Sequence, residues 1–214
     1  MKRIVVMISG SGSNLQTLIE QIHLTDVDAE IVGVIANKPD AYGLTRAENA
    51  GIANVCVDNS LYANDRVAYD QLLISTIEQY QPDLIVLAGF MRILTDEFVT
   101  HYLGQLINIH PSLLPKYKGL NTHQRAMDNG DSEHGVSVHF VTPELDDGPV
   151  ILQAKVPIFS DDDANMLAQR VQVQEHHIYP LVVKWFVEGR LLMRSGKAVM
   201  DDQCLGPNGF ASDE

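Results

Sequence analysis

The sequence predicts an α/β fold with a mostly parallel, twisted sheet flanked by helices and with antiparallel strands toward the C-terminal half. First, apolar runs alternate with amphipathic stretches along the chain, which is typical of strands that alternate with helices. Second, a glycine-rich turn, Ser9–Asn14, separates the first apolar run from the first amphipathic stretch. Third, the apolar run Leu106–Ile109 ends just before Pro111, and proline cannot donate a hydrogen bond to a neighbouring strand.

The first half of the chain supplies the parallel part of the sheet. Short apolar runs predict four strands, at Ile4–Ile8, Ile31–Ala36, Asn54–Val57 and Leu84–Ala88. The third run is short and fits the edge of a sheet. Apolar residues at helical spacing predict the intervening helices, at Asn14–His23, Leu44–Ala50 and Arg66–Tyr80. Gln81-Pro82-Asp83 separates the last of these helices from the strand that follows.

The second half of the chain contributes the antiparallel strands. Its expected elements, in order, are a short helix that starts at Thr95-Asp96, the strand Leu106–Ile109, strands at Val136–Val141 and Val150–Pro157, and a helix over Asp161–Val187. The turn Asp146-Asp147-Gly148 favours antiparallel pairing of the last two strands. Pro180 must kink or interrupt the long helix. The polar tail after Met200 is expected to be irregular.

Composition excludes several classes of protein. A chain of 214 residues that is 45% hydrophobic can bury one core and is expected to form a single domain. A net charge of -13 argues against nucleic acid as a partner. The two cysteines form no CxxC motif, which indicates a reducing compartment and no structural metal. No apolar run approaches the roughly 20 residues of a membrane span. We therefore expect a soluble, cytoplasmic protein without membrane contact.

The strand before Pro111 presents a candidate catalytic pair. Asn108 and His110 are two residues apart on the strand, so their side chains project from one face. They lie at the end of the strand, where open α/β sheets bind ligands. An amide donor beside an imidazole suits a reaction that builds negative charge on a carbonyl oxygen. The long stretch 111–130 that follows predicts a lid that excludes water.

The glycine-rich turn Ser9–Asn14 is a candidate anion site. Its glycines let backbone N–H groups approach a ligand at the start of a helix. It is no P-loop, because no GK[ST] sequence follows. The dinucleotide fingerprint also fails, because Leu15 occupies the third glycine position and Asn37 replaces the expected acidic residue. A tight strand-to-helix turn without any ligand remains the alternative.

Four motifs taken together resemble the phosphoribosylglycinamide formyltransferase family. They are Ser9–Asn14, Leu87–Leu94, Asn108–Pro115, and His134–His139 continuing to Asp146–Pro149. The similarity extends through Gln174-Glu175-His176 and Tyr179-Pro180 and covers essentially the whole chain. It implies a Rossmann-like, formyltransferase-type domain over 1–214. Within it, 1–100 would be a phosphate-binding half, 101–200 a folate-binding and catalytic half, and 201–214 an irregular tail.

The resemblance also implies a reaction in de novo purine biosynthesis. A formyl group passes from 10-formyltetrahydrofolate, the co-substrate, to the amine of glycinamide ribonucleotide. The catalytic set would be Asn108, His110 and Asp146. Ribonucleotide-binding residues would be Gly12, Ser13, Asn14 and Glu175. Folate-binding residues would be Arg66, Met91, Arg92, Ile93, Leu94 and Asn108. Asp147 and Pro143 depart from the family pattern near the catalytic acid and in the pterin loop.

The residue types fit a direct transfer. The amine attacks the formyl carbon, and Asn108 Nδ2 and a protonated His110 donate to the oxygen of the tetrahedral intermediate. Asp146 favours the protonated imidazole and relays the amine proton. Ser137 and His139 alternate on the strand Val136–Val141 and are expected to support the site. His134 and His139 lack the neighbouring acids or cysteines of a metal site, so no metal is expected.

Other functions stay open at this point. One alternative is another enzyme that uses the same formyl donor, of the methionyl-tRNA formyltransferase or formyltetrahydrofolate hydrolase type. The first would be expected to carry a further C-terminal domain and a basic surface, and the second an N-terminal regulatory domain. A non-catalytic nucleotide- or folate-binding module is a further alternative, since each polar residue has an ordinary structural explanation by itself. A monomer or a weak homodimer that binds only small molecules is expected.

Overall fold

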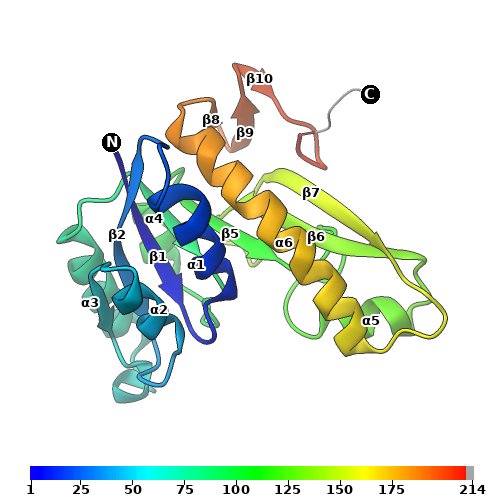
Figure 1. The fold of residues 1–214 in the computed structure, drawn as a ribbon, viewed down its shortest axis with the longest axis horizontal. Coiled ribbons are helices and arrows are strands. Elements are labelled where there is room, and N and C mark those ends of the chain that lie inside the picture. Colours follow the sequence, from blue (N-terminus) through cyan, green and yellow to red (C-terminus); the bar gives the residue numbers. More distant parts are fainter. Residues whose placement is uncertain (211–214) are drawn as a thin grey trace. The chain divides into compact units, whose positions relative to one another are not determined.

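The computed structural model describes residues 1–210 and forms two sheets (Figure 1). Seven strands form the main sheet in the order β3-β2-β1-β4-β5-β6-β7, and three strands form a second sheet in the order β10-β9-β8. The fold class predicted from the sequence is therefore confirmed. The chain divides into two compact units, Met1–Ile107 and Asn108–Glu214. The strand β5 (Leu106–His110) crosses that boundary.

The first unit contains the parallel strands and four of the predicted helices. Its strands are β1 (Lys2–Ile8), β2 (Ala29–Ala36), β3 (Asn54–Cys56) and β4 (Leu84–Leu87). β1 pairs in parallel with β2 and β4, and β2 with β3, which lies at the edge as expected. All of β4 and most of β1 are buried, as in parallel strands covered on both faces.

Two of the α-helices of the first unit begin at residues that cap them with a side chain. The helices of this unit are α1 (Ser13–Leu18), α2 (Gly43–Asn49), the 3₁₀ turn η2 (Asn59–Tyr62), α3 (Arg66–Glu78) and α4 (Asp96–His101). Asp65 caps α3 by accepting from Ala68 N. Thr95 caps α4 by accepting from Phe98 N, which confirms the predicted helix start.

The predicted helix Asn14–His23 is only partly correct. Its second half is the π-helix η1 (Ile19–His23). His23 at the end of η1 accepts a hydrogen bond from Ile31 N of β2 at 3.2 Å. Apolar spacing over so few residues does not distinguish a π-helix from an α-helix, so the change of helix type was not predicted.

The second unit contains the antiparallel strands and the long helix. β6 (Glu133–Phe140) and β7 (Val150–Pro157) pair antiparallel, as predicted. The helix α6 (Ala164–Val187) runs alongside both strands (Figure 1). It begins at the cap residue Asp163, later than predicted, and continues through Pro180 without interruption. A short helix, α5 (Thr122–Asp128), lies within the stretch 111–130.

The tail after Met200 is not irregular throughout, so that prediction is wrong for its first part. β8 (Leu191–Arg194), β9 (Lys197–Met200) and β10 (Gln203–Cys204) form the antiparallel second sheet. Both hairpin turns, Ser195-Gly196 and Asp201-Asp202, have positive φ at their two central residues, as tight hairpins require. Residues 211–214 of the predicted tail lie outside the described residues.

Candidate active site

Four polar side chains of the second unit converge at the end of β5. Asn108 and His110 come from β5, His139 from β6, and Asp146 from the turn between β6 and β7. His110 Nδ1 lies 3.5 Å from Asp146 Oδ2, and His139 Nε2 lies 3.9 Å from Asp146 Oδ1. The side chains of His110, His139 and Asp146 are each less than 10% exposed. The sequence therefore brings its predicted carboxamide, imidazole and carboxylate into one small cluster.

His139 orients Asn108. His139 Nδ1 lies 2.9 Å from the carbonyl oxygen of Phe140, which can only accept, so Nδ1 carries the ring hydrogen. His139 Nε2 is then free to accept a hydrogen bond from Asn108 Nδ2 at 3.2 Å. Burial lowers the pKa of His139 to about 4, which keeps the ring neutral and able to accept. An amide nitrogen has two hydrogens, so Asn108 retains one N–H for a ligand.

His110 is held between two acceptors. Its Nε2 donates to the carbonyl oxygen of Tyr117 at 2.9 Å, which fixes the orientation of the ring. Its Nδ1 faces Asp146. When the ring is protonated, its Nδ1–H lies on the side of the Asp146 carboxylate, 3.5 Å from Oδ2. This arrangement can place two donors on one developing oxyanion.

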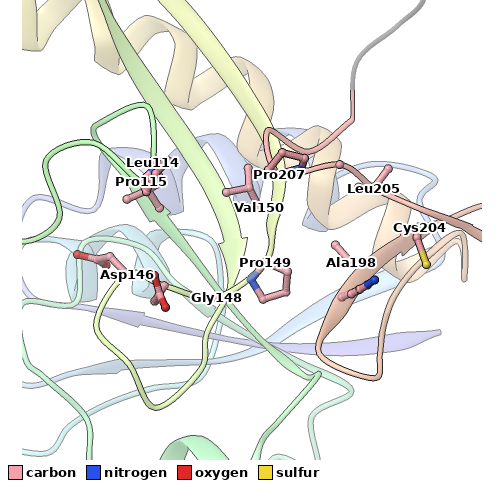
Figure 2. Close-up of a pocket in the computed structure, with 13 residues that line it drawn as sticks. Leu114, Pro115, Asp146, Gly148, Pro149, Val150, Ala198, Cys204, Leu205 and Pro207 are labelled. Carbon is pink, nitrogen blue, oxygen red and sulfur yellow. The ribbon is translucent and has the colours of Figure 1, made fainter.

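The turn that carries Asp146 is closely fixed. Asp146 has φ 48°, and its Oδ2 accepts from Gly119 N at 2.9 Å. Asp147, which departs from the family pattern, forms an ion pair with Lys118. Figure 2 shows this turn on one side of a cavity of about 470 Å³, with residues of β9 and β10 on the other side. The stretch 117–119 thus contributes a carbonyl and an N–H group to the cluster, and a cation to the neighbouring Asp147.

Ser137 supports the turn that follows β5. Its hydroxyl donates to Ser112 O at 2.6 Å and accepts from Leu114 N at 3.0 Å. Gln153 Nε2 donates both to the Ser137 hydroxyl and to Leu114 O, each at 2.9 Å. These bonds tie residues 112–114 to β6 and β7. Sequence alternation identified Ser137 but gave no sign of its partner Gln153.

A pair of histidines, of which His134 is buried and His123 half-buried, connects two elements in the same part of the second unit. His134 Nε2 and His123 Nδ1 are 3.1 Å apart, so β6 contacts α5 there. His134 is 1% exposed. Burial lowers the pKa of His134 to about 4, and burial also lowers the pKa of His123. One ring of the pair must therefore be neutral to accept from the other.

We predict that folding stability falls as the pH falls from 6.5 toward 4. His134 binds a proton in the unfolded chain below its ordinary pKa of 6.5 but resists protonation in the folded chain down to about 4. The stabilisation is complete above pH 6.5, and the loss by pH 5 is on the order of 2 kcal/mol from this residue. Urea unfolding of the wild type and His134→Gln at pH 7.5 and 5 measures it. An equally steep pH dependence in both proteins would contradict the assignment.

The glycine-rich turn of the first unit forms a compact loop before α1. Gly12 has φ 70°, in the left-handed region, and a Cβ there would lie 2.8 Å from Gly43 Cα. Arg46 Nε donates to Ser11 O at 2.8 Å, and Arg46 Nη1 donates to Gln16 Oε1 at 3.1 Å. Two contacts from α2 therefore hold the loop: the close approach of Gly43 to Gly12, and the hydrogen bond from the Arg46 guanidinium to Ser11 O. Its left-handed glycine turns the backbone into α1 at Ser13.

The expected folate-binding residues of the first unit are the segment Met91–Leu94, which follows β4, and Arg66 of α3, which contacts it. Met91 is 69% exposed and Ile93 is 59% exposed, whereas Leu94 is buried. Met91 N donates to Ser9 Oγ at 2.7 Å, and Arg66 Nη2 donates to Ile93 O at 2.7 Å. The segment therefore presents two apolar side chains outward while its backbone is held at both residues.

The predicted site residues fall into separate groups. Asn108, His110, His139 and Asp146 form the cluster of the second unit, and Glu175 lies on α6 of the same unit. The glycine loop and the segment 91–94 belong to the first unit, so the predicted folate-binding residues other than Asn108 lie outside the half 101–200. Among residues 1–210, no group of His, Cys, Asp and Glu side chains could hold a metal ion. None of the described helices is both long and apolar enough to cross a membrane.

Comparison with known proteins gives a consistent picture. Residues 2–183 match the formyl transferase family. The chain is 56% identical over 211 residues to phosphoribosylglycinamide formyltransferase of Escherichia coli (strain K12), covering 99% of each chain. It is 48% identical over 213 residues to the Haemophilus influenzae enzyme of the same name, covering 100% of both. The solved structure of phosphoribosylglycinamide formyltransferase from Coxiella burnetii, in complex with CHES, superimposes with a TM-score of 0.92 at 48% identity and 97% coverage of each chain.

Proposed function

Since this chain belongs to the formyl transferase family, we propose that Asn108, His110 and Asp146 catalyse its reaction. The chain is a transferase of purine biosynthesis that formylates glycinamide ribonucleotide from formyltetrahydrofolate. The observation that carries the catalytic assignment is the convergence of the three side chains around one point of the second unit. The specific donor proposed is 10-formyltetrahydrofolate, and the whole chain is proposed to act as a single formyltransferase domain.

In the proposed mechanism the substrate amine attacks the formyl carbon directly. A C–N bond forms, and the carbonyl π pair moves to oxygen, where the remaining N–H of Asn108 and the Nδ1–H of protonated His110 stabilise the charge. Asp146 accepts the amine proton, directly or through a water molecule, and returns it to N10 of the folate as the C–N10 bond breaks. The products are the formylated ribonucleotide and tetrahydrofolate. Each oxyanion donor is expected to contribute about 3 kcal/mol.

The proposed ribonucleotide site uses Gly12, Ser13, Asn14 and Glu175. Its support is the family resemblance together with the left-handed Gly12, which directs the loop backbone into α1. The proposed folate site uses Arg66, Met91–Leu94 and Asn108. Its support is the exposed pair Met91 and Ile93, which offers apolar contacts to a ring. Ser137 and His139 are proposed to support the cluster through the hydrogen bonds described above.

Gly12→Ala is expected to weaken ribonucleotide binding and lower stability. An L side chain at φ 70° costs about 1–2 kcal/mol, and its Cβ would press on Gly43. We expect the KM for glycinamide ribonucleotide to rise several-fold while the KM for the formyl donor stays close to the wild-type value. Gly10→Ala is the matched control, since a Cβ at Gly10 meets no atom within 4 Å. Equal effects of both substitutions on the ribonucleotide KM would contradict this role of Gly12.

The activity itself is tested by formyl transfer with defined acceptors. The purified chain is mixed with 10-formyltetrahydrofolate and either glycinamide ribonucleotide, water alone or initiator methionyl-tRNA. We expect formylation only of the ribonucleotide. Hydrolysis of the donor without an acceptor would favour a formyltetrahydrofolate hydrolase. Formylation of the tRNA would favour a methionyl-tRNA formyltransferase. The net charge of -13 disfavours the tRNA.

The remaining parts of the proposal concern partners and location. The chain is proposed to act in the cytoplasm, as a monomer or weak homodimer, on small molecules without nucleic acid or membrane. No metal is proposed, because the developing negative charge has donors in Asn108 and His110. The net charge of -13 supports the proposal that nucleic acid is not a partner, and the absence of a CxxC motif supports the proposal that the chain holds no structural metal.

A further inference from the structure

Three residues of α3 hold the segment Met91–Thr95. Arg66 Nη2 donates to Ile93 O at 2.7 Å, and Asp70 Oδ2 accepts from Thr95 N at 2.6 Å. Residues four apart lie on the same face of a helix, so Arg66 and Asp70 hold the segment at two points. Tyr69, on the same part of the helix, contacts Arg92, which precedes Ile93.

Arg92 lies immediately before these two points, and its side chain points inward. Its Cζ lies 4.1 Å from the centre of the Tyr69 ring. Its Nε is 4.0 Å from Asp70 Oδ1, and the side chain is only 13% exposed. Met91 and Ile93 on either side are largely exposed. The segment therefore alternates, with Arg92 as an inward anchor and its two neighbours directed outward.

The charges around Arg92 are balanced without a direct hydrogen bond. Among the described residues, Arg92 Nε and Nη2 and Asp70 Oδ1 are buried without a hydrogen-bond partner. At 4.0 Å the carboxylate still compensates the guanidinium charge. The Tyr69 ring adds a cation–π contact, and the Tyr69 hydroxyl fixes that ring by donating to Val57 O at 2.8 Å. Removing either the Asp70 charge or the Tyr69 ring leaves the buried guanidinium with less favourable electrostatic interaction. The Arg92 side chain is then expected to move toward solvent.

We propose that Asp70 and Tyr69 are positioning residues for the formyl donor. They hold the Arg92 side chain in its buried position through the ring contact and the ion pair. Arg92 held in this way fixes the outward direction of Met91 and Ile93, against which the folate is proposed to bind. The inference rests on the proposed function for the assignment of 91–94 to the folate. It adds two residues that do not themselves contact the donor, and it makes the Arg92 side chain an internal anchor.

The test measures steady-state kinetics of the full-length chain with both substrates. Asp70→Asn keeps an oxygen for Thr95 N but removes the charge that faces Arg92. We expect the KM for 10-formyltetrahydrofolate to rise about tenfold, with kcat and the KM for glycinamide ribonucleotide within about twofold of wild type. Tyr69→Leu, which removes the ring but stays apolar, is expected to give the same split. Asp65→Asn, at the cap of the same helix, is the matched control and is expected to change neither KM, since asparagine caps equally well.

A double-mutant cycle tests whether Asp70 affects donor binding through Arg92. If Asp70 acts through Arg92, then Asp70→Asn has little further effect on the donor KM in an Arg92→Met background. An equal rise in both backgrounds would overturn the proposal, as would a parallel change of kcat and both KM values in Asp70→Asn and Tyr69→Leu. If Arg92→Met raises the donor KM and neither α3 variant does, the proposal alone fails. If Arg92→Met leaves the donor KM unchanged, the assignment of this segment to the folate fails and the proposal fails with it.

Discussion

Replacing His110 by alanine is expected to lower kcat by about 10²–10³-fold, the cost of removing one oxyanion donor. The imidazole contacts Asp146 through Nδ1 and is fixed by Tyr117 O through Nε2, so it is presented in one orientation. Because the charge it stabilises exists only in the transition state, the KM values for donor and ribonucleotide should change by no more than a few-fold. Steady-state assays with each substrate varied in turn measure these values.

His177→Ala is the matched control for this prediction. His177 is exposed on α6, so its removal should leave kcat and both KM values near those of the wild type. Near-normal turnover in His110→Ala would require a different donor to the oxyanion. A large rise in either KM with kcat unchanged would instead make His110 a binding residue.

Asp146→Asn is expected to lower kcat by about 10²-fold or more, in the range of general acid–base catalysis. Asparagine can still accept from Gly119 N, so the turn is retained. It removes the negative charge that faces His110 and the base that accepts the amine proton. The loss should therefore appear in kcat rather than in the thermal midpoint of unfolding.

Asp147→Asn separates this effect from a general change of the turn. Asp147 is the neighbouring residue, more than half exposed and paired with Lys118. Its substitution removes one charge from the same turn but none from the cluster, so activity should be close to that of the wild type. Equal losses in Asp146→Asn and Asp147→Asn would contradict the assignment and point to the turn geometry instead.

The parts of the fold that the sequence predicted are those with a periodic signal. The buried run Leu84–Leu87, the cap at Thr95 and the pairing of β6 with β7 all follow from residue type and spacing. The π-helix η1 was not predicted, because apolar spacing over so few residues does not distinguish a π-helix from an α-helix. The second sheet was missed because its strands are very short, although Ser195-Gly196 is a recognisable hairpin turn.

The same distinction applies to the site. Asn108, His110 and Asp146 were predictable, because side-chain chemistry and the family resemblance both point to them. The Tyr117 carbonyl and the Gly119 N–H were not, since every residue has these backbone groups and only the folded loop aims two of them at His110 and Asp146. Similarly, the hydrophobic neighbours of Arg92 in sequence gave no sign of the contacts with Tyr69 and Asp70, which lie more than 20 residues earlier.

Single-turnover kinetics test most directly whether these three side chains act on the formyl carbon. Enzyme in excess over donor labelled in the formyl group is mixed with saturating glycinamide ribonucleotide, and label is followed in the product, the protein and the residual donor. Label should pass from donor to ribonucleotide without appearing in the protein, and His110→Ala and Asp146→Asn should slow this step at unchanged substrate dissociation constants. Labelled protein in the wild type, or a transfer step of wild-type rate in both variants, would contradict the mechanism.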